Sequence, residues 1–129
     1  MFEIEICEAH SISLVSFQGD VSPADFAELD RVARTRASDV GFHVIYDMTG
    51  VQVSNLLTDF VAARGQLPQP FKDFERVYVV PQDDLKLLVR LYIAYQQARG
   101  WRPPILVDTL DEALQHLGVA RTDFRRAIL

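Results

Sequence analysis

The chain has 129 residues, 49% of them hydrophobic and 24% charged, with a formal net charge of −5. A chain of this length typically forms one compact domain. Its apolar content is too high for a disordered protein, and it has neither the glycine period of collagen nor the many cysteines of a disulfide scaffold. The acidic balance also disfavours nucleic acid or an anionic membrane as a partner.

The sequence favours a cytoplasmic location. Cys7 is the only cysteine, so no intramolecular disulfide can form, which fits a reducing compartment. The first five residues carry acids where a signal peptide has a basic end followed by an apolar run. The most apolar stretch, residues 85–98, is interrupted by Arg90 and is shorter than the roughly 20 residues that cross a bilayer.

The first elements in chain order are two strands. Residues 2–6 alternate apolar and acidic side chains, and residues 12–17 are rich in β-branched and aromatic side chains. With a short polar turn between them, they predict an antiparallel hairpin.

A helix is predicted next, with Ser22 as its cap and Pro23 in the first turn. Asp30 and Arg34 lie four residues apart on it and are expected to pair. The residues expected to face inward are Phe26, Leu29, Val32 and Ala33.

Residues 42–46 form an apolar run that is typical of a strand covered on both faces. Residues 48–53 are predicted to form a loop, and Ser54 or Asn55 to cap a helix that ends near Gly65. Arg64 is expected to pack its stem on the apolar side of this helix and to extend its charge into water. The residues expected to face inward are Leu56, Leu57, Phe60, Val61 and Ala63.

Residues 76–81 predict another buried strand, followed by a long helix over 83–99 that Gly100 ends. This helix has more apolar surface than one sheet face usually covers. Two interpretations stay open: it packs between the sheet and a neighbouring helix, or it forms a homodimer interface through Leu87, Leu91 and Ala94.

Residues 105–107 predict a last short strand. Thr109 and Glu112 then have the spacing of a capping box, for a helix that ends at Gly118. Its inward side chains are expected to be Ala113, Leu114 and Leu117. Residues 119–129 are expected to form an exposed C-terminal tail after a domain of residues 1–118.

Together these elements predict a single α/β domain. Its mixed sheet would have about five strands, an N-terminal antiparallel hairpin followed by βαβαβα, with about four helices and right-handed crossovers. The order of the strands in the sheet stays open.

Three stretches, residues 19–26, 44–51 and 107–114, match a known family in their order along the chain and in their pattern of residue types. On these, residues 1–118 resemble a STAS-type domain of the SpoIIAA-like group, which is named after bacterial anti-sigma-factor antagonists. The resemblance implies a non-catalytic regulatory module that binds a protein partner. In these antagonists a partner kinase phosphorylates a serine at the start of the second helix. The acceptor serine is absent here, and Ser54 and Thr58 are the nearest candidate phosphoacceptors.

No motif predicts catalysis, a cofactor or a metal. His10, His43 and His116 lack the spacing of a zinc site, and there is no glycine-rich phosphate loop or nucleophile elbow. Acidic residues at the predicted helix starts, such as Asp83 and Asp108, are favoured there by the helix dipole alone.

The expected binding edge lies beyond the carboxyl ends of the parallel strands, where ligands of open α/β sheets bind. We expect Asp47, Thr49, Ser54 and Asn55 to line this edge and to contact a partner or ligand.

Three functions remain open. The first is a regulatory, protein-binding module that forms a homodimer, and the second is a carrier or sensor of a small apolar ligand. The third, an enzyme with an unfamiliar site, has no support from any spacing. The apolar ligand would lie between the second and third helices, in a pocket walled by Phe60, Phe71, Phe74, Tyr92 and Tyr95, although these residues would equally fill an ordinary core.

Overall fold

The structure is a computed structural model, and it describes residues 1–36, 41–68 and 73–127. Its strands are β1 (Phe2–Cys7), β2 (Ile12–Val21), β3 (His43–Ser54), β4 (Arg76–Val79), β5 (Ile105–Val107) and β6 (Arg125–Arg126). Its helices are α1 (Pro23–Arg36), α2 (Thr58–Gly65), α3 (Asp83–Ala98) and α4 (Leu110–Leu117), with short 3-10 turns at Glu8–His10 and Arg121–Asp123.

The strands form one mixed sheet in the order β5-β4-β3-β2-β1-β6. β1 and β2 form the predicted antiparallel hairpin, and β2, β3, β4 and β5 are parallel to one another. The predicted α/β class is therefore confirmed. So is the prediction that the strands around residues 42–47, 76–81 and 105–107 lie side by side.

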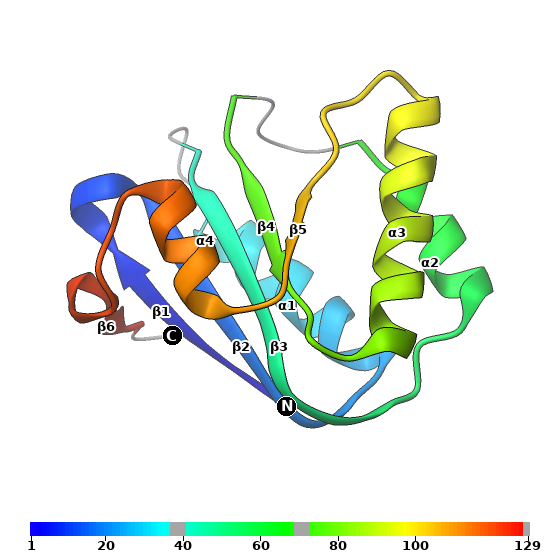
Figure 1. The fold of residues 1–129 in the computed structure, drawn as a ribbon, viewed down its shortest axis with the longest axis horizontal. Helices are drawn as coiled ribbons and strands as arrows, with labels where there is room; N and C mark the ends of the chain where they lie inside the picture. The colour runs from blue at the N-terminus through cyan, green and yellow to red at the C-terminus, as the bar shows by residue number, and fades with distance from the viewer. Residues whose placement is uncertain (37–40, 69–72, 128–129) are drawn as a thin grey trace.

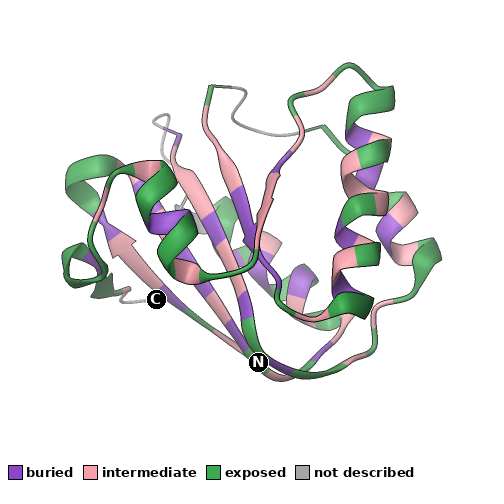
Figure 2. Ribbon diagram, in the orientation of Figure 1, coloured by how far each residue is buried: buried purple, intermediate pink, exposed green. Residues whose placement is uncertain are grey.

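The helices cover the two faces of the sheet unequally. α1, α2 and α3 lie on one face, and α4 lies on the other (Figure 1). Alternate residues of β4 show this division, because Tyr78 packs toward α1, α2 and α3 while Val77 and Val79 pack toward α4. The strand segments beneath the helices are the most deeply buried parts of the chain (Figure 2).

β3 is twice as long as predicted, so the expected loop over residues 48–53 is wrong. The second half of β3 pairs with the end of β2, after register shifts between Ser16 and Gln18 and between Gly19 and Asp20. These irregularities break the period-2 pattern that indicates a strand. Gly50 is required there, because a Cβ atom would lie 2.9 Å from the carbonyl oxygen of Phe17.

α2 begins at Thr58, so the prediction that Ser54 or Asn55 caps it is wrong. Leu57 occupies the N-cap position and provides no side-chain hydrogen bond. Asn55 instead continues the sheet, since its N–H donates to the carbonyl oxygen of Val21 at 2.8 Å. Because the helix starts later than predicted, Leu57, which was expected to face inward, is 70% exposed.

The other predicted helices agree more closely with the structure. Phe26, Leu29 and Val32 of α1 are buried, whereas Ala33 is exposed. Half of the predicted capping box of α4 is present, since Thr109 Oγ1 accepts the N–H of Glu112 at 3.2 Å, while the Glu112 carboxylate accepts from the Thr109 hydroxyl instead of its backbone N–H. In the described part of the chain, no helix combines the length and apolar character needed to cross a membrane.

The C-terminal segment folds onto the sheet instead of forming the expected tail. β6 pairs antiparallel with β1, where Glu5 lies opposite Arg126 and Ile6 opposite Arg125. Phe124 is only 8% exposed and packs in the core on the α4 face. The domain therefore includes residues beyond 118.

Candidate functional site

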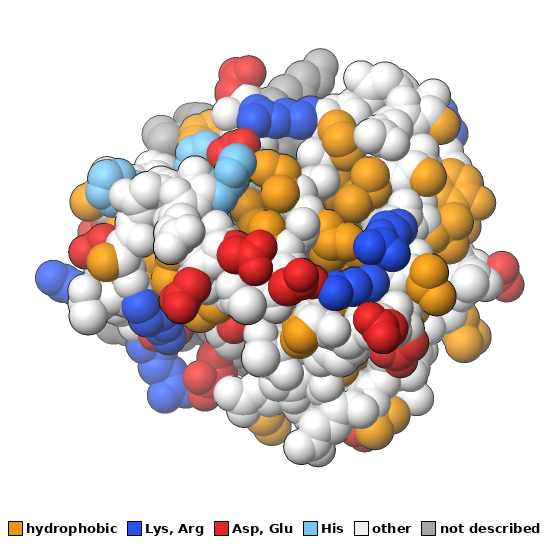
Figure 3. All heavy atoms as spheres, in the orientation of Figure 1, with side chains coloured by type: hydrophobic (Ala, Val, Ile, Leu, Met, Phe, Trp, Pro, Cys, Tyr) orange, Lys and Arg blue, Asp and Glu red, His pale blue; other side chains and the backbone are white. Residues whose placement is uncertain are grey.

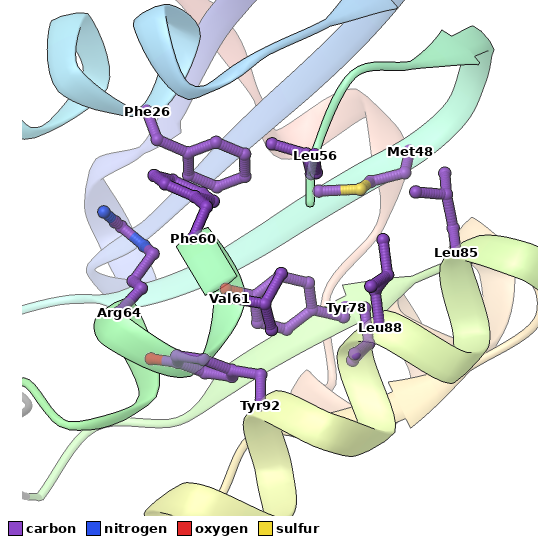
Figure 4. A pocket seen from close by; sticks show the side chains of 11 residues that line it. Phe26, Met48, Leu56, Phe60, Val61, Arg64, Tyr78, Leu85, Leu88 and Tyr92 are labelled. Carbon is purple, nitrogen blue, oxygen red and sulfur yellow. The ribbon is translucent and has the colours of Figure 1, made fainter. Parts of the chain in front are cut away.

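The candidate site is an apolar cavity of about 40 Å³ between α1, α2, α3 and the sheet (Figure 4). Phe26 comes from α1, Met48 from β3 and Tyr78 from β4. The residues that line it are Phe26, Met48, Leu56, Phe60, Val61, Arg64, Tyr78, Leu85, Leu88, Val89 and Tyr92. Several of these, including Leu56, Phe60 and Leu88, are only half-buried, so the cavity reaches the surface of the protein.

Helical spacing and aromatic packing build its walls. Leu85, Leu88 and Tyr92 project from one side of α3 because residues three and four apart share a helix face. The ring of Phe26 lies 5.8 Å from that of Phe60, which joins α1 to α2 across the cavity. These contacts leave a concave apolar surface with few polar groups, as is usual for ligand sites.

Arg64 is the one charged residue of the lining. Its two terminal nitrogens donate to the two carboxylate oxygens of Asp30 on α1, at 2.8 and 2.9 Å. Its guanidinium also lies 4.9 Å from the centre of the Phe26 ring. Burial alone would lower the pKa of Arg64, but the hydrogen bonds and charge of Asp30 outweigh it and raise the pKa, so the side chain stays cationic.

The prediction for Arg64 is therefore correct for its stem and wrong for its charge. The side chain is 20% exposed and forms an ion pair instead of extending into water. The predicted pairing of Asp30 with Arg34 is also replaced, since the Asp30 carboxylate faces α2. A local pair four residues apart gains only a few tenths of a kcal/mol, and a bidentate Arg–carboxylate pair is stronger.

Three tyrosines, two from the sheet and one from α3, lie next to one another. The rings of Tyr46 and Tyr78 stack at 4.5 Å, and Tyr92 lies 6.1 Å from Tyr78. Desolvation raises the pKa of both Tyr46 and Tyr78, so these hydroxyls remain protonated at neutral pH. Arg76 donates a hydrogen bond to the Tyr92 hydroxyl at 2.6 Å.

Gln96 of α3 holds the C-terminal end of α2. It is fully buried, and its Nε2 donates to the carbonyl oxygens of Gly65 at 2.7 Å and Leu67 at 3.1 Å. Gly65 packs so closely on α3 that a Cβ atom would lie 2.6 Å from the Cβ of Tyr95. No local sequence pattern indicates that a glutamine within an apolar helix will donate to carbonyl groups at the end of another helix.

The predicted aromatic pocket is found in part. Phe60 and Tyr92 line the cavity, and Tyr95 packs on Gly65 beside it. Phe74 lies elsewhere, with its ring 4.9 Å from that of His43. Phe71 lies outside the described residues.

The four residues of the predicted binding edge lie in two places. Asp47 and Thr49 are neighbours on the α4 face of β3, where the Thr49 hydroxyl donates to Asp47 at 2.6 Å. Ser54 ends the same strand and Asn55 follows it. At roughly 3.3 Å per residue, Ser54 lies about 16 Å beyond Thr49 along the strand. Ser54 and Asn55 form no single edge with Asp47, because β3 continues where a loop was expected.

The other candidate residues lie on exposed surface. Leu87 is 65% exposed on α3, Leu91 is half-buried and Ala94 is exposed, so these dimer candidates are accessible. Of the candidate phosphoacceptors, Thr58 is exposed, and Ser54 is half-buried with its Oγ accepting the N–H of Leu56 at 3.3 Å.

A polar cluster, separate from the cavity, lies at the amino end of β4. Glu75 contacts His116 Nε2 and Arg102, each at 3.0 Å, and its backbone N–H donates to His43 Nδ1 at 2.8 Å. Histidine, acidic and basic side chains gather on this part of the α4 face (Figure 3). Even so, no group of three or more His, Cys, Asp or Glu among the described residues could hold a metal ion.

The chain matches no family model and no curated protein sequence.

Proposed function

We propose that this protein is a non-catalytic binding module that takes up the apolar part of a small molecule in the cavity between α1, α2 and α3. The observation that carries the proposal is the cavity itself, which lies between three helices and the sheet and has one charged residue in its lining. An alkyl group placed there would exchange contact with water for contact with apolar side chains, which is worth about 0.8 kcal/mol per buried CH₂.

A ligand must widen the cavity to enter. A volume of about 40 Å³ is well below the roughly 150 Å³ that accommodates benzene in an engineered cavity. The lining includes Met48, whose unbranched side chain adapts readily to a new shape, and the half-buried Leu88. Small side-chain movements, with a shift of α2, would create room for an alkyl chain.

The two ends of α2 are held unequally, which supports entry from its N-terminal side. Its C-terminal end is held by Gln96, by the Arg64 ion pair and by close packing at Gly65. Its N-terminal end has no side-chain cap and is preceded by the exposed Leu57. Helix ends without such contacts open at the lowest free-energy cost.

Titration with 1-octanol, followed by methyl NMR, tests the proposal. We expect saturable shifts of the methyl signals of Met48, Val61, Leu85 and Leu88. Leu88→Ala enlarges the cavity and should strengthen binding, whereas Val61→Phe fills it and should abolish binding. Leu67→Ala is the matched control, because Leu67 is 56% exposed and lies outside both the cavity lining and the proposed dimer interface.

The absence of saturable shifts in the wild-type protein would overturn the proposal. So would equal effects of Leu88→Ala and Leu67→Ala, because octanol binding would then not depend on the cavity. The opposite signs expected for Leu88→Ala and Val61→Phe keep the test decisive even where one variant loses stability.

A second candidate function is a regulatory role through a protein partner, which the exposed segment at residues 54–58 favours. Asn55, Leu57 and Thr58 are exposed in this segment, while Leu56 between them lines the cavity. A ligand that moves Leu56 would therefore change the surface offered to a partner. Phosphate on Ser54 or Thr58, detected by mass spectrometry of protein purified from its native host, would support this role, and unmodified residues would contradict the phosphorylation part of it.

We also propose a homodimer through α3, in a cytoplasmic setting where the buried Cys7 stays a free thiol. The exposed Leu87 and Ala94 favour this interface. Light scattering at high micromolar concentration should give twice the monomer mass, and Leu91→Glu should return the monomer. A wild-type monomer under these conditions would contradict the dimer.

A further inference from the structure

The two ends of the cavity differ in polarity. Met48 and Leu85 lie at one end, and Arg64 and Tyr92 lie toward the other (Figure 4). A ligand with an alkyl chain among the apolar side chains would therefore place its head group near Arg64.

Arg64 has hydrogen-bonding capacity to spare. A guanidinium carries five N–H donors, and Asp30 takes two of those on Arg64. Among the described residues, Asp30 is the one hydrogen-bond partner of this side chain. Three donors thus remain on a cation that is 20% exposed and lies over the Phe26 ring.

Tyr92 offers another donor at the same end. Its hydroxyl oxygen accepts a hydrogen bond from Arg76 at 2.6 Å, and this leaves the hydroxyl hydrogen free to be donated. No acceptor for it is present in the part of the chain that the structure describes. The guanidinium of Arg76 also lies 5.7 Å from the Tyr92 ring and adds positive charge behind the hydroxyl.

The charged group that lines this end of the cavity is the Arg64 cation. No carboxylate belongs to the lining, and its partner Asp30 lies outside the lining and is 41% exposed. An arginine can bind one carboxylate through one edge of its planar fork and a second group through the remaining donors. A negatively charged head group would meet unused donors without displacing Asp30.

We propose that the cavity selects ligands with an anionic carboxylate head group, which Arg64 binds with help from the Tyr92 hydroxyl while the apolar chain lies among Phe60, Leu88 and Met48. This rests on the proposed function, because it specifies the ligand class of the same cavity. The ligand class is a small apolar carboxylic acid in its ionised form.

The test compares octanoate with 1-octanol at pH 7.5 by isothermal titration calorimetry, since the two probes have the same chain length and differ in head-group charge. Charge-assisted hydrogen bonds of about 1.5–3 kcal/mol predict that octanoate binds at least about tenfold more tightly. Arg64→Gln should remove this difference, and Tyr92→Phe should reduce it. Asp30→Asn should strengthen octanoate binding and leave octanol binding unchanged, because it removes the competing carboxylate.

Arg90→Gln is the matched control, since Arg90 is an exposed arginine on α3 and outside the lining. It should leave both probes unaffected. If Arg64→Gln is not folded by circular dichroism, the opposite effect expected of Asp30→Asn still decides the matter.

Octanol binding as tightly as octanoate in the wild-type protein, or Arg64→Gln and Asp30→Asn changing both probes alike, would overturn anion recognition and leave the proposed function intact. If neither probe binds, the proposed function fails as well.

Discussion

Arg64 on α2 and Asp30 on α1 form a bidentate ion pair across 34 positions of the sequence. It connects two helices that have no other charged contact at this cavity, among the residues that the structure describes. The pair thus joins α1 to α2 beside the cavity.

A double-mutant cycle with Arg64→Gln and Asp30→Asn should give a coupling energy of about 1–2 kcal/mol. This lies between the values for exposed pairs and fully buried pairs, because the two side chains are 20% and 41% exposed. The Glu28–Arg31 pair on α1 is the control, with side chains 50% and 59% exposed, and its cycle should give a clearly smaller coupling energy. Urea denaturation measures both cycles, and equal coupling in the two would contradict a structural role for the pair at the cavity.

Gln96→Leu should lower the free energy of unfolding by roughly 2–4 kcal/mol. The variant fits a similar volume but leaves the carbonyl oxygens of Gly65 and Leu67 without their buried donor. Gln97→Leu changes the exposed neighbour on the same helix and should stay within about 0.5 kcal/mol. A similar small effect from both variants would show that Gln96 does not anchor the end of α2.

Phe124→Ala should destabilise the protein by about 3 kcal/mol, because the ring is 8% exposed and packs in the core on the α4 face. Arg125→Ala, at an exposed position in β6, should have little effect. Thermal unfolding monitored by circular dichroism distinguishes the two. An unchanged midpoint for Phe124→Ala would mean that the C-terminal segment is the exposed tail that the sequence suggests.

The protein should lose stability as the pH falls below about 6.5, with His43 as one cause. Desolvation lowers the pKa of His43 from its ordinary value of 6.5, as does the charge of Arg102, while Glu75 partly opposes the shift. The unfolded state then binds the proton more readily than the folded state, so the free energy of unfolding decreases below the unfolded pKa until the folded pKa is reached. Protonation at Nδ1 would also break the hydrogen bond from Glu75 N–H.

Chemical denaturation between pH 7.5 and 5.5 measures this effect. His43→Asn keeps an acceptor for the Glu75 N–H and should flatten the pH dependence. His10→Gln, at an exposed position in the first 3-10 turn, should retain it. Glu75 and His116 are unchanged in both variants, so an identical slope in the two would exclude His43 as the cause.

The alternation of strands and helices was predictable because local signals agree along most of the chain. The apolar runs at residues 42–46 and 76–81 and the N-cap at Thr109 can each be recognised within a few consecutive residues. The second half of β3 was missed because Thr49 and Gly50 resemble a turn, and the register shifts against β2 disrupt the alternation.

The cavity was only partly predictable, because its polar contacts join distant segments. Phe60 and Tyr92 could be placed from helical spacing, and so could the stem of Arg64. The choice of Asp30 as its partner depends on how α1 and α2 pack, and a nearer candidate, Arg34, was available to Asp30. Likewise, the role of Gln96 depends on where α2 ends against α3.

A crystal structure of the protein grown with 1-octanol would show whether the cavity binds an alkyl chain. We expect the alkyl chain between Phe26, Phe60 and Leu88, with the N-terminal end of α2 displaced outward and its C-terminal end held by Gln96. Octanol on another surface, with the lining side chains of the cavity unmoved, would contradict the proposed function.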